Sequence, residues 1–81
     1  MNLQFTSRAR KEYLALPEKL QRATDKQIDY LLKNLRHPSL RAKKYDESDD
    51  RWQARITRDH RFYFQIVDDI YVIVAITRHP K

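Results

Sequence analysis

The sequence predicts a small α+β domain with the element order β-α-α-β-β-β, in which two helices pack on one face of a largely antiparallel sheet. Apolar residues recur at helical spacing between 20 and 35, the pattern of an amphipathic helix. From residue 52 onward they alternate with polar residues, the pattern of strands. With 81 residues, we expect one domain over 1–81 and a thin core.

The first half of the chain predicts a short strand and two helices. Apolar and polar residues alternate over 2–5, and Thr6 or Ser7 can cap the helix that follows. Pro17 ends this helix and suits the first turn of the next one, which stops before Pro38. Because the connection is so short, we expect the two helices to form an αα-hairpin.

The second half predicts three strands. A three-residue loop at 58–60 keeps the apolar sets of the first two strands on one face, and it pairs Ile56 with Phe62. The segment 70–76 is apolar at nearly every position, which predicts an interior strand buried on both faces. We expect the N-terminal strand to pair along the free side of this strand.

Composition excludes several classes of function. The absence of glycine excludes a phosphate-binding loop and a dinucleotide fingerprint, and the absence of cysteine excludes a thiolate metal site. The acidic run 46–50 lacks the glycine and terminal glutamate of a calcium loop, so we expect neither metal nor cofactor. No apolar run approaches the ~20 residues that span a bilayer, and the N-terminus lacks the blocks of a signal peptide, which predicts a cytoplasmic protein without membrane partners.

Basic residues are expected to converge on the sheet face opposite the helices. The net charge of +6 attracts polyanions such as RNA or DNA, or an acidic protein. Alternation puts Arg55, Arg61 and Tyr63 on that face, where guanidinium groups bind phosphate and a tyrosine stacks on a base. The residues expected to border this patch are Lys43, Lys44, Arg78, His79 and Lys81.

This set of residues fits RNA cleavage by attack of the RNA's own 2′-hydroxyl. That reaction needs a base, an acid and cations that stabilise the phosphorane, and it needs no metal. Arg55, Arg61 and Arg78 supply the positive charge, and His79 is the candidate acid or base. The alternative is an ordinary solvated sheet face, with His79 a surface residue near the chain end. The other histidines, His37 at a helix end and His60 in a turn, are assigned no role.

The run HPSLRAKKYDESDDRWQARITRDHRFYFQIVDDIYVIVAITRH resembles the RelE/ParE superfamily of type II toxin–antitoxin toxins. The shared features are a proline-terminated second helix, a lysine-rich approach to the sheet, an R-x-T-x-x-x-R hairpin and a closing apolar strand that ends in basic residues. The N-terminal FTSRARKEYLALP is also similar, so the resemblance covers nearly the whole chain.

The resemblance implies a toxin that a cognate antitoxin neutralises. In the RelE branch the toxin cleaves mRNA in the ribosomal A site without a metal. By position, the residues that match the basic positions of that branch are Arg55 and Arg61, then Arg78 and His79, then Lys43 and Lys44. Many RelE-type nucleases also carry a tyrosine after the last strand, whereas this sequence has none beyond Tyr71. The alternatives are a ParE-like inhibitor of DNA gyrase without nuclease activity, and a catalytically inactive RNA-binding or interaction domain.

Overall fold

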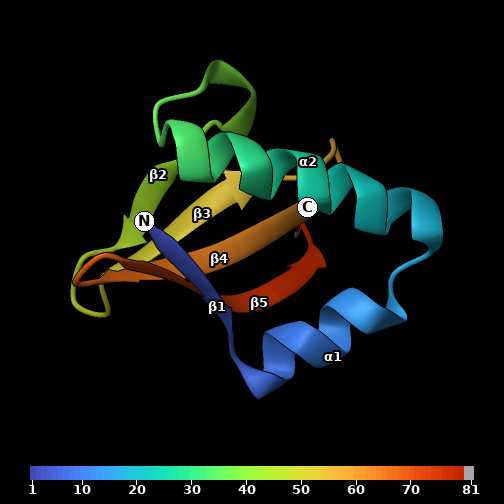
Figure 1. Ribbon diagram of the computed structural model, residues 1–81, viewed down its shortest axis with the longest axis horizontal. Coiled ribbons are helices and arrows are strands. Elements are labelled where there is room, and N and C mark those ends of the chain that lie inside the picture. The colour runs from blue at the N-terminus through green and yellow to red at the C-terminus, as the bar shows by residue number, and fades with distance from the viewer. Residues whose placement is uncertain (80–81) are drawn as a thin grey trace.

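The computed structural model describes residues 1–79 and confirms the α+β class (Figure 1). The elements are β1 (Asn2–Phe5), α1 (Ser7–Ala15), α2 (Glu18–Lys33), the 3-10 helix η1 (Pro38–Leu40), β2 (Lys43–Asp46), β3 (Arg51–Arg55), β4 (His60–Val67) and β5 (Ile70–Arg78). The predicted order lacked η1 and β2. Alternation is hard to recognise in the four residues of β2, because this edge strand is paired along one side and carries two lysines.

The five strands form one mixed sheet in the order β1-β5-β4-β3-β2. Strand β1 runs parallel to β5 and the other neighbours are antiparallel, so the predicted place of the N-terminal strand is confirmed. Strand β5 is interior, as predicted. It is not buried on both faces, because Tyr71 and Ile73 are buried whereas Val72 and Val74 remain partly exposed. The helices cover one face of the sheet, and the other face stays open.

The hydrophobic core lies between α2 and the covered face of the sheet. Phe62 and Phe64 on β4 are fully buried and pack with Leu31 of α2 and with Leu40 of η1. Burying an aromatic or leucine side chain contributes about 1.5–3 kcal/mol, so these residues account for much of the stability of so small a chain. Each strand therefore presents one apolar side to the helices and one polar side to the open face.

The β3–β4 hairpin differs from the predicted register by two residues. Ala54 pairs with Phe62 and Arg55 pairs with Arg61, so the three-residue loop is 57–59 and starts one residue earlier than predicted. The shift is even, which is why the apolar sets still lie on the predicted face. The loop is held by the Arg61 side chain, whose Nη1 donates to the carbonyl oxygen of Thr57 at 2.6 Å. A side chain reaching back into its own loop is not visible in an apolar pattern.

Helix α1 begins at its predicted cap. It also lies along the edge of β5 beyond the point where β1 ends. The Thr6 side chain accepts from the backbone N–H of Ala9 at 3.1 Å. Beyond Phe5, the free edge of β5 is satisfied by α1, since the Glu12 carboxylate accepts from the backbone N–H of Ile76 at 2.9 Å. The two helices meet near Pro17 and diverge from there (Figure 1), so the predicted αα-hairpin is an open one. In the described part of the chain, neither helix is long and apolar enough to cross a membrane.

We expect Glu12→Ala to lower the free energy of unfolding by about 1–2 kcal/mol, because the N–H of Ile76 is nearly buried and loses its acceptor. Urea denaturation measures this loss. Glu12→Gln keeps an acceptor oxygen and should cost much less. Arg8→Ala removes the exposed ion pair at 3.4 Å and should cost little, so equal losses in all three variants would contradict this role of Glu12.

Candidate functional site

Three arginines gather at one end of the sheet and form what we call the arginine cluster, namely Arg41, Arg55 and Arg61. Arg55 and Arg61 lie directly opposite each other on β3 and β4, on the face away from the core. Arg41 follows η1 and precedes β2. Partial burial lowers the pKa of Arg61, and repulsion from Arg55 and then from Arg41 lowers that pKa further. The charges of Arg55 and Arg41 therefore both act on Arg61.

No carboxylate forms an ion pair with the cluster within residues 1–79. Asp59 and Tyr63 are near enough to raise the pKa of Arg61, but the lowering effects outweigh them. Like charges held together without a counter-ion repel one another, and a bound anion relieves that repulsion. Guanidinium groups bind phosphate through forked, charge-assisted hydrogen bonds. The cluster is therefore suited to a phosphate group.

Arg61 also organises the loop beside the cluster. Its Nη1 donates to three carbonyl oxygens, those of Thr57, Arg58 and His60, at 2.6, 3.2 and 2.9 Å. All three bonds use this one nitrogen, which leaves the other donors of the guanidinium for a ligand. The same loop holds the end of β5, because the carbonyl oxygen of Asp59 accepts from the N–H of His79 at 2.7 Å. Arg61 thus fixes the backbone that carries the candidate acid or base.

A buried amide joins the elements that carry Arg41 and Arg55. Gln27 of α2 is 6% exposed, and its Nε2 donates to the carbonyl oxygens of Arg55 at 2.8 Å and Ser39 at 3.1 Å. Its Oε1 accepts from Ser39 Oγ at 3.2 Å. These bonds tie the end of β3 to η1, immediately before Arg41. A buried amide with its partners in place fixes geometry, because each group would be costly to leave unpaired.

Aromatic residues extend the same face toward β2. Lys43, Gln53 and Tyr63 lie opposite one another in one row across three strands. The ring of Tyr45 meets that of Tyr63 edge to face, with centroids 5.2 Å apart. Tyr45 is 49% exposed, so part of this aromatic pair is open to a ligand. An exposed aromatic ring beside a cluster of arginines offers a stacking surface for a nucleobase.

The remaining predicted residues lie in different places. Arg78 pairs with His60, one position beyond the pair of Thr77 with Arg61, so side-chain alternation puts Arg78 on the helix side of the sheet. His79 lies beside the β3–β4 loop. Lys44 is engaged elsewhere, in ion pairs with Asp50 at 2.8 Å and Glu47 at 3.6 Å. The hydrogen bond to Asp50 raises the pKa of Lys44. Lys81 is outside the described residues.

Sequence reasoning missed Arg41 and Gln27. Arg41 follows the buried Leu40 and adopts a left-handed backbone with a φ of 46°. Its only sequence signal was membership of the basic run 41–44. Gln27 is one of many polar residues in this amphipathic helix, and nothing in the sequence marks it as buried.

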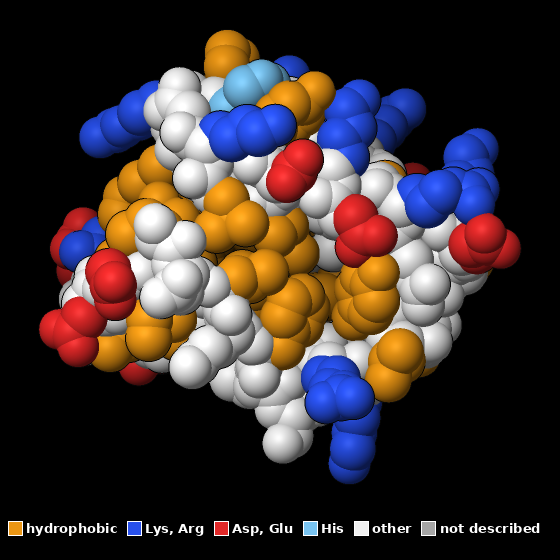
Figure 2. Space-filling model, viewed as in Figure 1, with side chains coloured by type: hydrophobic (Ala, Val, Ile, Leu, Met, Phe, Trp, Pro, Cys, Tyr) orange, Lys and Arg blue, Asp and Glu red, His pale blue; other side chains and the backbone are white. Residues whose placement is uncertain are grey.

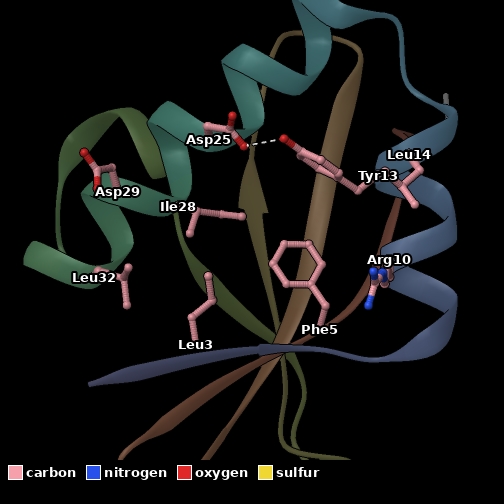
Figure 3. A pocket seen from close by; sticks show the side chains of 9 residues that line it. All are labelled: Leu3, Phe5, Arg10, Tyr13, Leu14, Asp25, Ile28, Asp29 and Leu32. Atoms are coloured by element: carbon pink, nitrogen blue, oxygen red, sulfur yellow. Dashed lines mark hydrogen bonds between the residues drawn. The ribbon is translucent and has the colours of Figure 1, made fainter.

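An apolar groove lies between α1, α2 and β1, on the other side of α2 from η1. Its volume is about 580 Å³, and hydrophobic side chains show across the middle of the surface in Figure 2. The residues that line it are Leu3, Phe5, Arg10, Tyr13, Leu14, Asp25, Ile28, Asp29 and Leu32 (Figure 3). The Tyr13 hydroxyl donates to Asp25 at 2.8 Å, and this bond raises the pKa of Tyr13. Leu14 is 63% exposed, so apolar surface is available to a partner.

We expect Gln27→Leu to lower the free energy of unfolding by about 2–3 kcal/mol and to move Arg41 relative to Arg55, because two carbonyl groups lose their donor. Chemical denaturation measures the first effect, and the NMR signals of the arginine Nε–H groups report the second. Thr24→Val is the matched control, since Thr24 is buried on the same helix and bonds to Leu20 within it. If both variants leave the arginine signals unchanged, Gln27 does not position the cluster.

Solved structures share this fold. A YoeB/ParE toxin from Agrobacterium tumefaciens matches with a TM-score of 0.83 and 15% identity, over 99% of this chain and 100% of that one. A YoeB–YefM toxin–antitoxin complex from Staphylococcus aureus matches with a TM-score of 0.79 and 16% identity, over 99% of this chain and 98% of that one. The intact E. coli RelBE toxin–antitoxin complex matches with a TM-score of 0.74 and 18% identity, over 99% of this chain and 98% of that one. At these identities the likeness establishes the fold.

Sequence comparison supplies the family. No curated protein matches this chain significantly. The family described as the ParE toxin of the type II toxin–antitoxin system, parDE, matches residues 3–80. Because that match spans nearly the whole sequence and the fold agrees with it, this chain belongs to the ParE toxin family of type II toxin–antitoxin systems.

Proposed function

We propose that this toxin inhibits translation as a metal-independent endoribonuclease that cuts mRNA in the ribosomal A site. The observation that carries the proposal is the arginine cluster, in which Arg55 and Arg61 pair across β3 and β4 and Arg41 lies near enough to lower the pKa of Arg61. None of the three forms an ion pair with a carboxylate among the described residues. Such a cluster fits the phosphodiester group of RNA. The fold shared with RelE and YoeB toxins supports the same assignment. Its place of action would be the cytoplasm.

In the proposed reaction the 2′-oxygen attacks the adjacent phosphorus and the 5′-oxygen leaves. Arg55 and the free donors of Arg61 bind the non-bridging oxygens, whose negative charge grows in the phosphorane. Tyr45 and Tyr63 stack on a neighbouring base, and Lys43 approaches the backbone along the same face. A proton passes from the 2′-hydroxyl to a base and another from an acid to the leaving oxygen.

His79 is the proposed acid or base, because its backbone is fixed beside the loop that Arg61 holds. Arg78 and Lys44 play a smaller part in this scheme. Arg78 lies on the helix side of the sheet and contributes through its charge, and Lys44 is already paired with Asp50. The cognate antitoxin is the proposed protein partner, and the groove between α1 and α2 offers it an apolar surface.

The test is cleavage of a defined mRNA during translation in vitro. We expect Arg55→Gln and Arg61→Gln each to slow cleavage about 100-fold or more, the usual effect of removing one group that stabilises transition-state charge. His79→Ala should slow it by about 100-fold or more as well. Arg22→Gln removes an exposed, ion-paired charge on α2 and serves as the control, with a rate like that of the wild type. Equal cleavage by all variants would show that the site lies elsewhere.

Inhibition of DNA gyrase is the second candidate function, and the match to the ParE toxin family favours it. In that case the protein acts by contact with gyrase and cuts no RNA. We expect a supercoiling assay to separate the two functions. Gyrase inhibition without mRNA cleavage would replace the first proposal, and induction without any effect on growth would favour a binding domain that is not a toxin.

A further inference from the structure

A second, smaller pocket lies at the opposite end of α2 from its junction with α1. It is enclosed by the segment between α2 and η1, by the residues that follow η1 and by β3, and its volume is about 200 Å³. The residues that line it are Leu35, Arg36, His37, Pro38, Arg41, Ala42 and Trp52. Two of them are arginines, two are aromatic, and no carboxylate is among them. This combination differs from the apolar groove between α1 and α2.

The aromatic walls of this pocket are held in place by their neighbours. The indole of Trp52 stacks on Phe64, with centroids 6.0 Å apart and planes at 17°. The imidazole of His37 stacks on Tyr30 of α2, with centroids 3.8 Å apart and planes at 8°. Its Nδ1 accepts from the backbone N–H of Ser39 at 3.2 Å. Walls fixed before a ligand arrives lose little conformational freedom on binding, which favours affinity.

The charges at the rim favour an anionic, planar ligand. Arg36 and Arg41 are both exposed, and within residues 1–79 neither forms an ion pair. A guanidinium group stacks on aromatic planes and donates two hydrogen bonds in one plane, which matches the acceptor edge of a nucleobase. Leu35 and Ala42 add apolar surface for the rest of such a ring.

Arg41 connects this pocket to the arginine cluster. It lines the pocket, and its charge also reaches Arg61 and lowers the pKa of that residue. Arg41 holds a left-handed backbone with a φ of 46°, a conformation that costs energy in a residue with a Cβ and tends to occur at functional sites. The Gln27 bonds to the carbonyl oxygens of Ser39 and Arg55 hold the segment that precedes Arg41 against the end of β3.

We propose that the pocket binds one unpaired nucleobase of an RNA whose adjacent phosphate lies on the arginine cluster. The base enters against Trp52 and His37, Arg36 pairs with its acceptor edge, and Arg41 bridges the base site to the phosphate site. The inference rests on the proposed RNA-directed function and adds a base subsite to it. The pocket then influences which nucleotide is placed next to the scissile bond.

Trp52 is the single tryptophan of the sequence, so it reports on the pocket directly. The experiment titrates the protein with each of the four nucleoside monophosphates and follows the indole N–H signal of Trp52 by NMR and its fluorescence. We expect saturable changes, with an affinity that differs between the bases. Inorganic phosphate and ribose 5-phosphate should bind at the cluster and leave Trp52 nearly unchanged, because they lack a base.

Variants separate the two parts of the site. Arg36→Gln should weaken nucleotide binding at least five-fold and leave binding of inorganic phosphate as in the wild type. Arg55→Gln should weaken the binding of both the nucleotides and inorganic phosphate. Lys33→Gln removes an exposed, ion-paired charge on α2 and is the matched control, with wild-type binding expected. All variants are compared at equal ionic strength, since phosphate binding depends on salt.

The outcomes distinguish this inference from the proposed function. If inorganic phosphate perturbs Trp52 as strongly as the nucleotides do, or if an acidic peptide binds there in their place, the pocket is not a base site and the inference is overturned. If mRNA is cleaved but no nucleotide reaches Trp52, the inference fails and the nuclease stands. If nucleotides bind with the expected variant pattern but no mRNA is cleaved, the base site stands and the nuclease fails.

Discussion

The packing of α2 against one face of the sheet is the constraint on which the rest of this protein depends. Phe62 and Phe64 carry the sheet side of that contact, and Leu31 carries much of the helix side. A sequence of 81 residues is enough for one hydrophobic core between a helix and a sheet, and too short for a second. The second face of the sheet is therefore left to the solvent, and it is free to carry charged and aromatic residues that a two-sided core would exclude.

Polar contacts at the edge of this core turn the open face into a defined site. Gln27 of α2 donates hydrogen bonds to the last residue of β3 and to η1. Arg61 donates hydrogen bonds to carbonyl groups of the β3–β4 loop. Both side chains donate to backbone carbonyl groups, those of the hairpin loop, of the end of β3 and of η1. The Gln27 bonds join segments far apart in the sequence, whereas the Arg61 bonds act within one loop. Together they fix the backbone that carries the arginines.

Charge is distributed unevenly along the sheet. At the β2–β3 turn, Lys44 and Arg51 are neutralised by the acidic residues of 47–50, with N–O distances of 2.8 Å from Lys44 to Asp50 and 3.1 Å from Arg51 to Asp49. At the opposite end, the arginine cluster has no such partners among the described residues. Positive charge without an acidic partner is thus present at the arginine end of the sheet, where it attracts an anion.

The amino-acid sequence by itself determined the fold class, the first helix cap, the interior place of β5 and the faces of the β3–β4 hairpin. These features follow from periodicity, from proline and from capping residues, which act over a few neighbouring positions. It also indicated Arg55, Arg61 and Tyr63, because alternation along a strand decides which side chains share a face. The tertiary structure decided the hairpin register, the strand β2, the burial of Gln27 and the approach of Arg41 to Arg61. It also put Arg78 on the other face and engaged Lys44 with Asp50. The hydrogen bond of Gln27 to Arg55 and the approach of Arg41 to Arg61 bring together residues distant in the sequence, and local patterns contain no information about such contacts. The hairpin register and the pair of Lys44 with Asp50 depend on side chains that turn back within a loop, which an alternation of apolar residues does not specify.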